Sequence, residues 1–273
     1  MRKWFYILLA LFPMLACVGQ KDDPFEDPGP DGSGTTDPCG ADEGQDFFRR
    51  SLVLDFTGTW CVNCPKMEAA ISETMEARPG RVVPVSVHCM MVDPMYAKPL
   101  SDDLVARFGV KAYPSAVVDM DPESLVSQSS PELLQSHIDR LLELRGAAAG
   151  IRIESSLEGE RYTVKATMKA VRDGDYVLVV LVLEDGIVAA QTGGTTDHVH
   201  DNVLRSWTES DALTGLKEGD TADFECQGTA SGIIRFAVLV LRGGLVDNVA
   251  TCNAGATAEY QYEQECPIAF EGL

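Results

Sequence analysis

The chain has 273 residues, of which 45% are hydrophobic and 23% are charged. This length and composition suit one large folded domain or two smaller ones, and they exclude a disordered or collagen-like chain. The 42 acidic residues outnumber the 22 basic ones and give a formal net charge of −20. Nucleic acid and anionic lipid surfaces are bound through Lys and Arg, so this charge argues against both and favours a soluble, extracytoplasmic protein.

The N-terminal residues predict a secretory signal. Two basic residues precede an apolar run over residues 4–16, which is shorter than the ~20 residues of a membrane-spanning helix. The run leads into Cys17 in a sequence that resembles a bacterial lipobox. This resemblance implies a lipoprotein signal peptide over residues 1–16 and lipid attachment at Cys17. An ordinary signal peptide that happens to contain a cysteine is the alternative.

Residues 17–46 are rich in Asp, Pro, Gly, Ser and Thr and contain hardly any large apolar side chain. Such a segment buries too little surface to offset the entropy of ordering it, so we expect a flexible acidic tether. Its Lys-Asp-Asp sequence at residues 21–23 resembles the surface-export signal of some Gram-negative lipoproteins. The chain is therefore expected at the outer membrane, held by its lipid anchor alone and facing the periplasm or the cell surface.

Residues 47–148 alternate between strand-like and helix-like patterns, which predicts an α/β domain. Strands are expected at residues 51–56, 81–88 and 115–120, with a hairpin partner at 124–127. Apolar residues at helical spacing predict helices that begin near Cys64, near Ser101 and after Ser130. The first two strands are joined through a helix, so they should run parallel.

From residue 149 to residue 273 the apolar period changes to two, as at Tyr162, Val164 and Ala166. Helical stripes are absent from this half of the sequence, and short apolar runs are separated by turn residues. The pattern predicts an all-β immunoglobulin-like sandwich of about seven strands.

The strongest chemical signal is the sequence Trp60-Cys61-Val62-Asn63-Cys64-Pro65, at the expected turn from a buried strand into a helix. This spacing lets the two sulfurs form a disulfide, and it places Cys61 where helix N–H groups stabilise a thiolate. A thiolate is the species that attacks disulfides, so the site predicts thiol–disulfide exchange. A static structural disulfide is the main alternative. A zinc site completed by His198 and His200 is disfavoured, because no second Cys-x-x-Cys exists, and no metal is predicted.

Residues 54–64 resemble the active-site segment of thioredoxin, and residues 109–115 resemble the thioredoxin segment that carries a cis-proline. The resemblance implies a thioredoxin-like fold for the first domain and no cofactor. It also implies that Cys61 is the exposed nucleophile, Cys64 the buried resolving thiol, and Asp55 the buried carboxylate that exchanges a proton with Cys64.

Substrate binding is implied by the same resemblance for Trp60, Tyr113 and Pro114. The bond between Tyr113 and Pro114 is expected to be cis, and the Tyr113 backbone to pair with an extended substrate polypeptide. Thioredoxin has Gly-Pro between its cysteines, whereas this chain has Val62-Asn63. The redox potential of thioredoxin is therefore not transferred.

The succession of lipobox, acidic tether, Cys-x-Asn-Cys-Pro sequence and β-rich second half resembles the twenty-eight-kilodalton outer-membrane protein family of bacteria. The resemblance spans nearly the whole mature chain and includes a weaker motif at residues 200–205. Members are mostly surface lipoproteins of poorly defined activity. Two functions remain open: disulfide exchange with the thiols of exported proteins, or non-catalytic binding of a protein or glycan with the cysteine pair as a static disulfide.

His88 and Cys89 follow the expected strand at 81–88. The carboxyl ends of parallel strands meet at one sheet edge, so both residues are expected near Cys61 as possible redox neighbours. Cys89 is either a third redox thiol, a disulfide partner of Cys39, or a small buried hydrophobic residue. The sequence leaves open the pairing of the remaining cysteines, which are Cys39, Cys226, Cys252 and Cys266.

Overall fold

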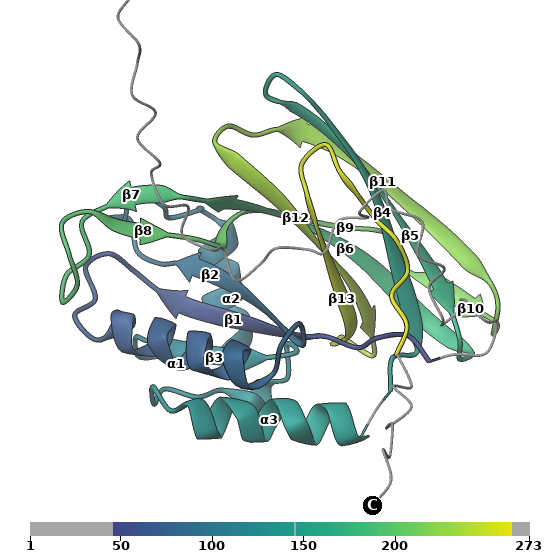
Figure 1. Cartoon of the computed structure of the whole chain (residues 1–273), viewed down its shortest axis with the longest axis horizontal. Coiled ribbons are helices and arrows are strands. Elements are labelled where there is room, and N and C mark those ends of the chain that lie inside the picture. The colour runs from purple at the N-terminus through teal and green to yellow at the C-terminus, as the bar shows by residue number, and fades with distance from the viewer. Residues whose placement is uncertain (1–45, 145, 264–273) are drawn as a thin grey trace, which may run out of the picture. The chain divides into compact units, whose positions relative to one another are not determined.

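The computed structural model describes residues 46–144 and 146–263 (Figure 1). The expected signal peptide at 1–16, the lipidation site Cys17, and the tether up to residue 45 lie outside the described residues. Cys39 and Cys266 lie outside them as well. Among the described residues, no helix has both the length and the apolar character that crossing a membrane requires.

All described helices occur before residue 145, and they alternate with three strands. In chain order these elements are β1 (Ser51–Thr57), α1 (Cys64–Ala77), β2 (Val82–His88), α2 (Leu100–Phe108), β3 (Ser115–Val118), the 3-10 helix η1 (Pro122–Ser124) and α3 (Pro131–Leu144). The prediction of a strand at 124–127 is wrong. Ser124 ends η1, and Val126 makes only an isolated bridge to Ala116.

The described residues after 148 form strands and turns. The strands are β4 (Ala149–Glu158), β5 (Arg161–Ala170), β6 (Gly174–Asp185), β7 (Ile187–Ala189), β8 (His198–His200), β9 (Val203–Glu209), β10 (Leu213–Leu216), β11 (Thr221–Thr229), β12 (Ile233–Arg242), β13 (Leu245–Asn253) and β14 (Thr257–Ala258). Buried and half-buried residues alternate along β5, and half-buried and exposed residues alternate along β11, which is the period of two seen in the sequence.

One mixed sheet contains strands from both halves of the chain. Its order is β13-β12-β6-β9-β2-β1-β3, and β10 pairs with β6 as an eighth strand. β1 and β2 are parallel, as predicted, and β3 is antiparallel to β1. The two halves meet where β2 pairs in parallel with β9, through Ser86 and Val203. A second sheet, β11-β5-β4-β14, and the small β7–β8 hairpin complete the strands (Figure 1).

The predicted fold class, an α/β thioredoxin-like domain followed by an all-β immunoglobulin-like sandwich, is wrong. The described chain is mostly β, and its main sheet is mixed and continuous across the two predicted parts. An unpaired edge strand exposes backbone N–H and C=O groups, and β9 covers the edge that β2 would otherwise present. The periodicity of each segment reveals its element type, but it does not reveal which distant strand pairs with an edge.

The hydrophobic cores also include one that extends across both halves of the chain. One hydrophobic core lies between α1, α3 and one face of β1, β2 and β3. The core on the opposite face includes α2 and extends from β1 and β2 into β6 and β12. A further core lies between β4, β5 and the other face of β6 and β12. The domain boundary predicted between residues 148 and 149 falls between α3 and β4 and stays a prediction.

A buried ionic cluster connects the start of the described chain to β13. The Arg49 guanidinium lies 2.7 Å from an Asp119 carboxylate oxygen and donates to the backbone oxygen of Asp247 at 2.9 Å. Asp119 also accepts a hydrogen bond from the Leu52 N–H at 2.8 Å. The Asp247 carboxylate accepts from the Ala148 N–H at 2.7 Å. Each of these buried charges therefore has polar partners from distant parts of the sequence.

Candidate functional site

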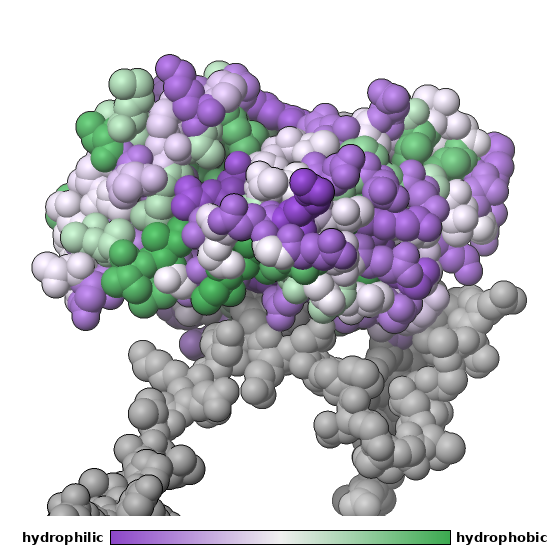
Figure 2. All heavy atoms as spheres, turned by 90° about the horizontal axis from the view of Figure 1, so that it is seen from above, coloured by the Kyte–Doolittle hydropathy of each residue, from purple (hydrophilic) through white to green (hydrophobic). Residues whose placement is uncertain are grey.

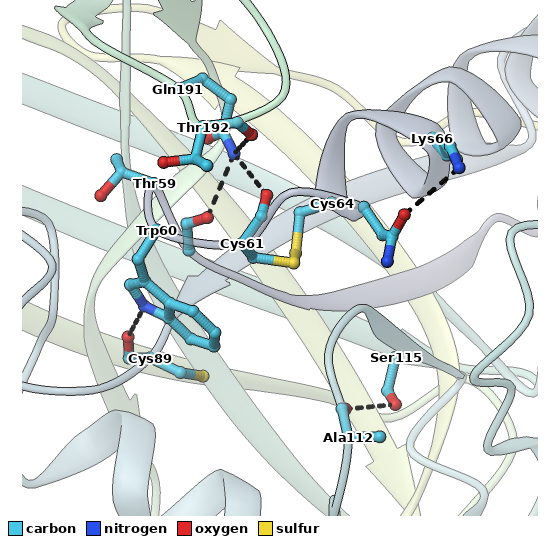
Figure 3. The surroundings of a disulfide bond; sticks show 12 residues. Thr59, Trp60, Cys61, Cys64, Lys66, Cys89, Ala112, Ser115, Gln191 and Thr192 are labelled. Carbon is cyan, nitrogen blue, oxygen red and sulfur yellow. Dashed lines mark hydrogen bonds between the residues drawn. A yellow bond between two sulfur atoms is a disulfide. The ribbon is translucent and has the colours of Figure 1, made fainter.

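The cysteine pair occupies the turn between β1 and α1 that the sequence predicts. Cys61 and Cys64 form a disulfide, with their Cα atoms 5.4 Å apart (Figure 3). The Cys61 N–H donates to the Gly58 oxygen at 3.0 Å, which closes the turn before the helix. Pro65 lies in the first turn of α1, where a missing N–H removes no helical hydrogen bond. Cys64 thus begins the helix, and both sulfurs lie near its positive end.

Both cysteines are buried, with 5% of Cys61 and 2% of Cys64 exposed to solvent. The expectation that Cys61 is exposed is therefore wrong. The loop of the β7–β8 hairpin lies against the backbone of this turn, where the Gln191 side-chain amide donates to the Cys61 oxygen at 2.9 Å (Figure 3). Gln191 lies 130 residues from Cys61 in the sequence, and no motif marks it as a residue of this site.

The expected substrate-binding residues lie together beside the cysteine turn. The rings of Trp60 and Tyr113 meet edge to face with centroids 5.2 Å apart. The Trp60 indole N–H donates to the Cys89 oxygen at 2.9 Å. The Tyr113–Pro114 peptide bond is cis, as predicted, and Pro114 is buried. The structure brings these aromatic residues to the site, while their role in binding a substrate stays a prediction.

Cys89 is close to Trp60, but its thiol is protonated and unreactive. Its side chain is buried, and its thiol donates to the Val87 oxygen at 3.2 Å. Burial is the main cause that raises the pKa of the Cys89 thiol to about 12. The protonated thiol is a poor nucleophile, so the structure favours the small buried hydrophobic residue over the third redox thiol. Cys89 makes no disulfide with another described residue.

Asp55 lies on the face of β1 that α1 covers. It alternates with Leu54 and Phe56, which pack into the opposite core, and it shares its face with Val53. Burial, with a contribution from the negative charge of Glu68, raises the pKa of Asp55 to about 8. One of its carboxyl oxygens, Oδ1, has no hydrogen-bond partner among the described residues. Asp55 is therefore a neutral acid at pH 7, held under the helix that carries Cys64.

Imidazoles and carboxylates cluster next to Asp55. His198 of β8 lies 3.1 Å from the carboxylate of Glu68 on α1. The ring of His200 lies 4.6 Å from that of His198 and 5.3 Å from that of His88, between ring centroids. Burial and the neighbouring histidines lower the pKa of His200 to about 4, so that it is neutral at pH 7.

Asp93 connects this cluster to the cysteine turn. Its carboxylate contacts His88 at 3.1 Å and accepts from the Thr59 N–H at 2.6 Å and the Met95 N–H at 2.8 Å. Although burial opposes ionisation, the hydrogen bonds from His88 and Thr59 hold the pKa of Asp93 below its usual range. Asp93 carries no recognisable motif, and in a chain with 42 acidic residues nothing in the sequence distinguishes it.

The described residues contain no group of three or more His, Cys, Asp or Glu side chains arranged to hold a metal ion. His198 and His200 contact other side chains rather than the cysteines. His198 is paired with Glu68, and the Cys61 and Cys64 sulfurs are bonded to each other. These contacts give no support to the zinc alternative.

Apolar surface is concentrated near the hairpin that covers the disulfide. On the face shown in Figure 2, hydrophobic residues are most extensive toward the end that carries β7 and β8 in Figure 1, and much of the rest is hydrophilic. Exposed apolar side chains in these segments include Val188 and Val199 of the hairpin and Val62 between the two cysteines.

No protein-family model matches the chain, and no curated protein matches it. Among solved structures, HBP35 of Porphyromonas gingivalis is similar with a TM-score of 0.66, at 17% identity over 81% of each chain. Protein AGR_C_4864 from Agrobacterium tumefaciens is similar with a TM-score of 0.54, at 16% identity over 78% of this chain and 97% of that one. Identities this low show a shared fold alone.

Proposed function

We propose that the protein exchanges its Cys61–Cys64 disulfide with the thiols of exported proteins. The observation that carries the proposal is the placement of this disulfide at the N-terminus of α1. On the face of β1 beneath that helix, the pKa of Asp55 is raised to about 8. The helix end stabilises a thiolate, and a neutral carboxyl group can donate the proton that a departing thiolate needs.

In the first step, a partner thiolate attacks the Cys61 sulfur and the Cys61–Cys64 bond breaks. Cys61 then holds the partner in a mixed disulfide, and Cys64 leaves as a thiolate that takes the proton of Asp55. In the second step, another thiolate of the same partner attacks the partner sulfur of the mixed disulfide and releases Cys61.

The partner has then lost two electrons and two thiol protons and carries a disulfide. The cysteine pair has gained two electrons and two protons, with Asp55 reprotonated from solvent. The same steps in reverse let the reduced pair reduce a partner's disulfide. The exposed side chains of Val62, Val188 and Val199 suit apolar segments of such a partner.

The location of the protein belongs to the same proposal. The lipobox-like sequence at Cys17, the acidic segment that follows it and the Lys-Asp-Asp signal support a lipid-anchored protein at the outer membrane. The Cys-x-Asn-Cys-Pro sequence, in the same order along the chain, supports membership of the twenty-eight-kilodalton outer-membrane protein family.

The test is to trap the mixed disulfide. The reduced Cys64→Ser variant retains Cys61 and lacks the resolving thiol, so it should accumulate a stable adduct with a peptide that carries an activated disulfide. Cys61→Ser should form no adduct, and Cys89→Ser should behave as the wild type. An absence of adduct with Cys64→Ser, together with a wild type that neither oxidises dithiols nor reduces disulfides, would contradict the proposal.

A second candidate function is a non-catalytic surface lipoprotein in which the pair is a static disulfide. The burial of both cysteines favours it, because a static pair needs no access to solvent. Equilibration against a series of glutathione redox buffers separates the two functions. A reduction potential below roughly −300 mV indicates a structural disulfide, and a higher potential supports exchange.

A further inference from the structure

We infer that residues 191–194, the segment of the β7–β8 loop that lies on the cysteine turn, form a removable cover over the Cys61–Cys64 disulfide, held closed by Gln191. This inference rests on the proposed function and adds its regulation: reaction at the pair requires the cover to open. The residue that controls access comes from the β-rich half of the chain.

The cover is attached to the cysteine turn by directional hydrogen bonds. The Gln191 side-chain amide donates to the Cys61 oxygen at 2.9 Å and to the Gly58 oxygen at 3.2 Å (Figure 3). The backbone N–H of Thr192 donates to the Thr59 oxygen at 2.8 Å. These bonds satisfy three carbonyl groups in the turn that holds the disulfide.

Gly193 allows the cover to approach the cysteine turn closely. A Cβ atom at this position would lie 2.3 Å from the Val62 backbone oxygen, far inside contact distance. Its φ angle of +80° is also one that residues with a side chain rarely adopt. The backbone of the cover therefore lies directly against Val62, the first of the two residues between the cysteines.

Few buried side chains hold this loop besides these bonds, although the hairpin that carries it is anchored at β8 by the pairing of His198 with Glu68 and by the buried His200. Gln191 is buried, whereas residues 192–197 are exposed. β7 and β8 pair only with each other among the described strands, and a two-stranded hairpin is marginally stable by itself. Segments with few buried apolar contacts open at a lower free energy than the global unfolding of the protein. The cover can therefore open while the sheets remain folded.

With the cover closed, only 5% of Cys61 is exposed. A thiolate must reach the sulfur along the S–S axis, and a buried sulfur does not permit that approach to a peptide or protein. When the cover opens, the oxygens of Thr59 and Cys61 lose these donors, and the Gly58 oxygen keeps only the Cys61 N–H. A partner that supplies backbone N–H groups replaces those donors, which favours polypeptide thiols as the partners that keep the cover open.

The test measures how fast dithiothreitol reduces the disulfide in the full, oxidised chain, followed by alkylation of Cys61 and mass spectrometry. Gln191→Ala should raise the rate constant about tenfold, as expected from the loss of roughly one net hydrogen bond or more. Gln191→Glu keeps the size of the side chain but cannot donate, so it should react as fast as Gln191→Ala. If Gln191→Ala loses the fold by circular dichroism, Gln191→Glu and Gly193→Ala carry the test.

Matched controls separate the cover from a general loss of stability. Thr192→Ala keeps the backbone N–H that makes the hydrogen bond, so its rate should equal that of the wild type. Gln227→Ala removes an exposed glutamine from β11 and should also change nothing. Equal rates for the wild type, Gln191→Glu and Gly193→Ala overturn the inference. Failure of the proposed function looks different: the variants react faster with dithiothreitol, but no protein exchanges with a cysteine peptide.

Discussion

Two buried aspartates in the first half of the chain have opposite surroundings. Asp119 accepts hydrogen bonds from Arg49, Ser51 and Leu52, whereas Oδ1 of Asp55 has no hydrogen-bond partner among the described residues. Burial raises the pKa of both, but Arg49 holds that of Asp119 down to about 6 while that of Asp55 reaches about 8. A satisfied carboxylate stabilises the fold, and an unsatisfied one is available for proton transfer.

The largest expected effect is a loss of stability when the hydrogen-bonded carboxylate of Asp119 is removed. Asp119→Ala leaves the buried Arg49 cation without its partner and should lower the free energy of unfolding by about 3–5 kcal/mol. Urea unfolding followed by circular dichroism measures this loss. Adding Arg49→Met to the variant should recover part of it, because the unpaired cation is then removed.

The control for this prediction is an exposed ion pair. Arg140 and Asp121 lie 3.4 Å apart at the surface, so Arg140→Ala should change the free energy of unfolding by no more than about 1 kcal/mol. If Asp119→Ala lowers the free energy of unfolding by no more than Arg140→Ala does, the hydrogen-bonded carboxylate of Asp119 does not stabilise the fold as proposed.

The second effect is on the rate of thiol–disulfide exchange when the carboxyl group of Asp55 is replaced. Asp55→Asn keeps the shape of the side chain but cannot donate an acidic proton to Cys64. The rate of exchange with a dithiol peptide at pH 7 should fall by about 10- to 100-fold, the low end of what a positioned acid–base group contributes. Stopped-flow fluorescence of Trp60, beside the pair, is a suitable readout. An unchanged rate would remove Asp55 from the mechanism.

The third effect is the pH dependence of stability. The folded state holds the Asp55 proton more tightly than the unfolded state, whose pKa is near the ordinary 3.8. Between pH 4 and pH 8 the folded chain therefore binds more protons, and the contribution of Asp55 to stability falls as the pH rises. Asp55→Asn should reduce this decline by at least about 1.4 kcal/mol, the equivalent of one pKa unit.

Urea unfolding of the wild type and Asp55→Asn at pH 5 and pH 8 measures the difference between the two slopes. Asp119→Asn is not a suitable control, because it also breaks the pair with Arg49. Parallel slopes for the wild type and Asp55→Asn would show that the pKa of Asp55 is not raised by folding.

The smallest expected effect is an adjustment of Asp55 by Glu68. The negative charge of Glu68 contributes to the raised pKa of Asp55, so Glu68→Gln should move the decline in stability to lower pH, by less than about one pH unit. Glu73→Gln, at an exposed position on the same helix, is the matched control. A shift to higher pH would mean that the pairing of Glu68 with His198 outweighs its effect on Asp55.

Much of the local structure follows from the sequence. The apolar run at 51–56 lies in β1, the stripe that begins at Cys64 is α1, and α3 begins at Pro131, directly after Ser130. These segments are recognisable because strand and helix periods depend on residues close in the sequence. The error at 124–127 has the same origin, because a short apolar stretch after Asp121-Pro122 fits a hairpin strand as well as the 3-10 turn that forms.

Part of the candidate site can also be predicted from the sequence. Cys61, Cys64, Asp55 and Trp60 are visible because they lie within one short stretch of sequence, and Tyr113-Pro114 because of its motif. Gln191 and Asp93 carry no motif. Their importance comes from the backbone groups that they contact, and those contacts exist only after distant loops are placed together.

The sequence by itself determines where the chain forms strands and helices and that two cysteines lie at the start of a helix. The tertiary structure decides that β9 joins the edge of β2, that a hairpin from the second half lies against the Cys61 turn, and that Asp55 remains without a full set of partners. The physical reason is the range of the forces involved. Periodicity and capping depend on residues close together in the sequence. Sheet edges and buried polar groups need hydrogen-bond partners, and these can come from anywhere in the chain.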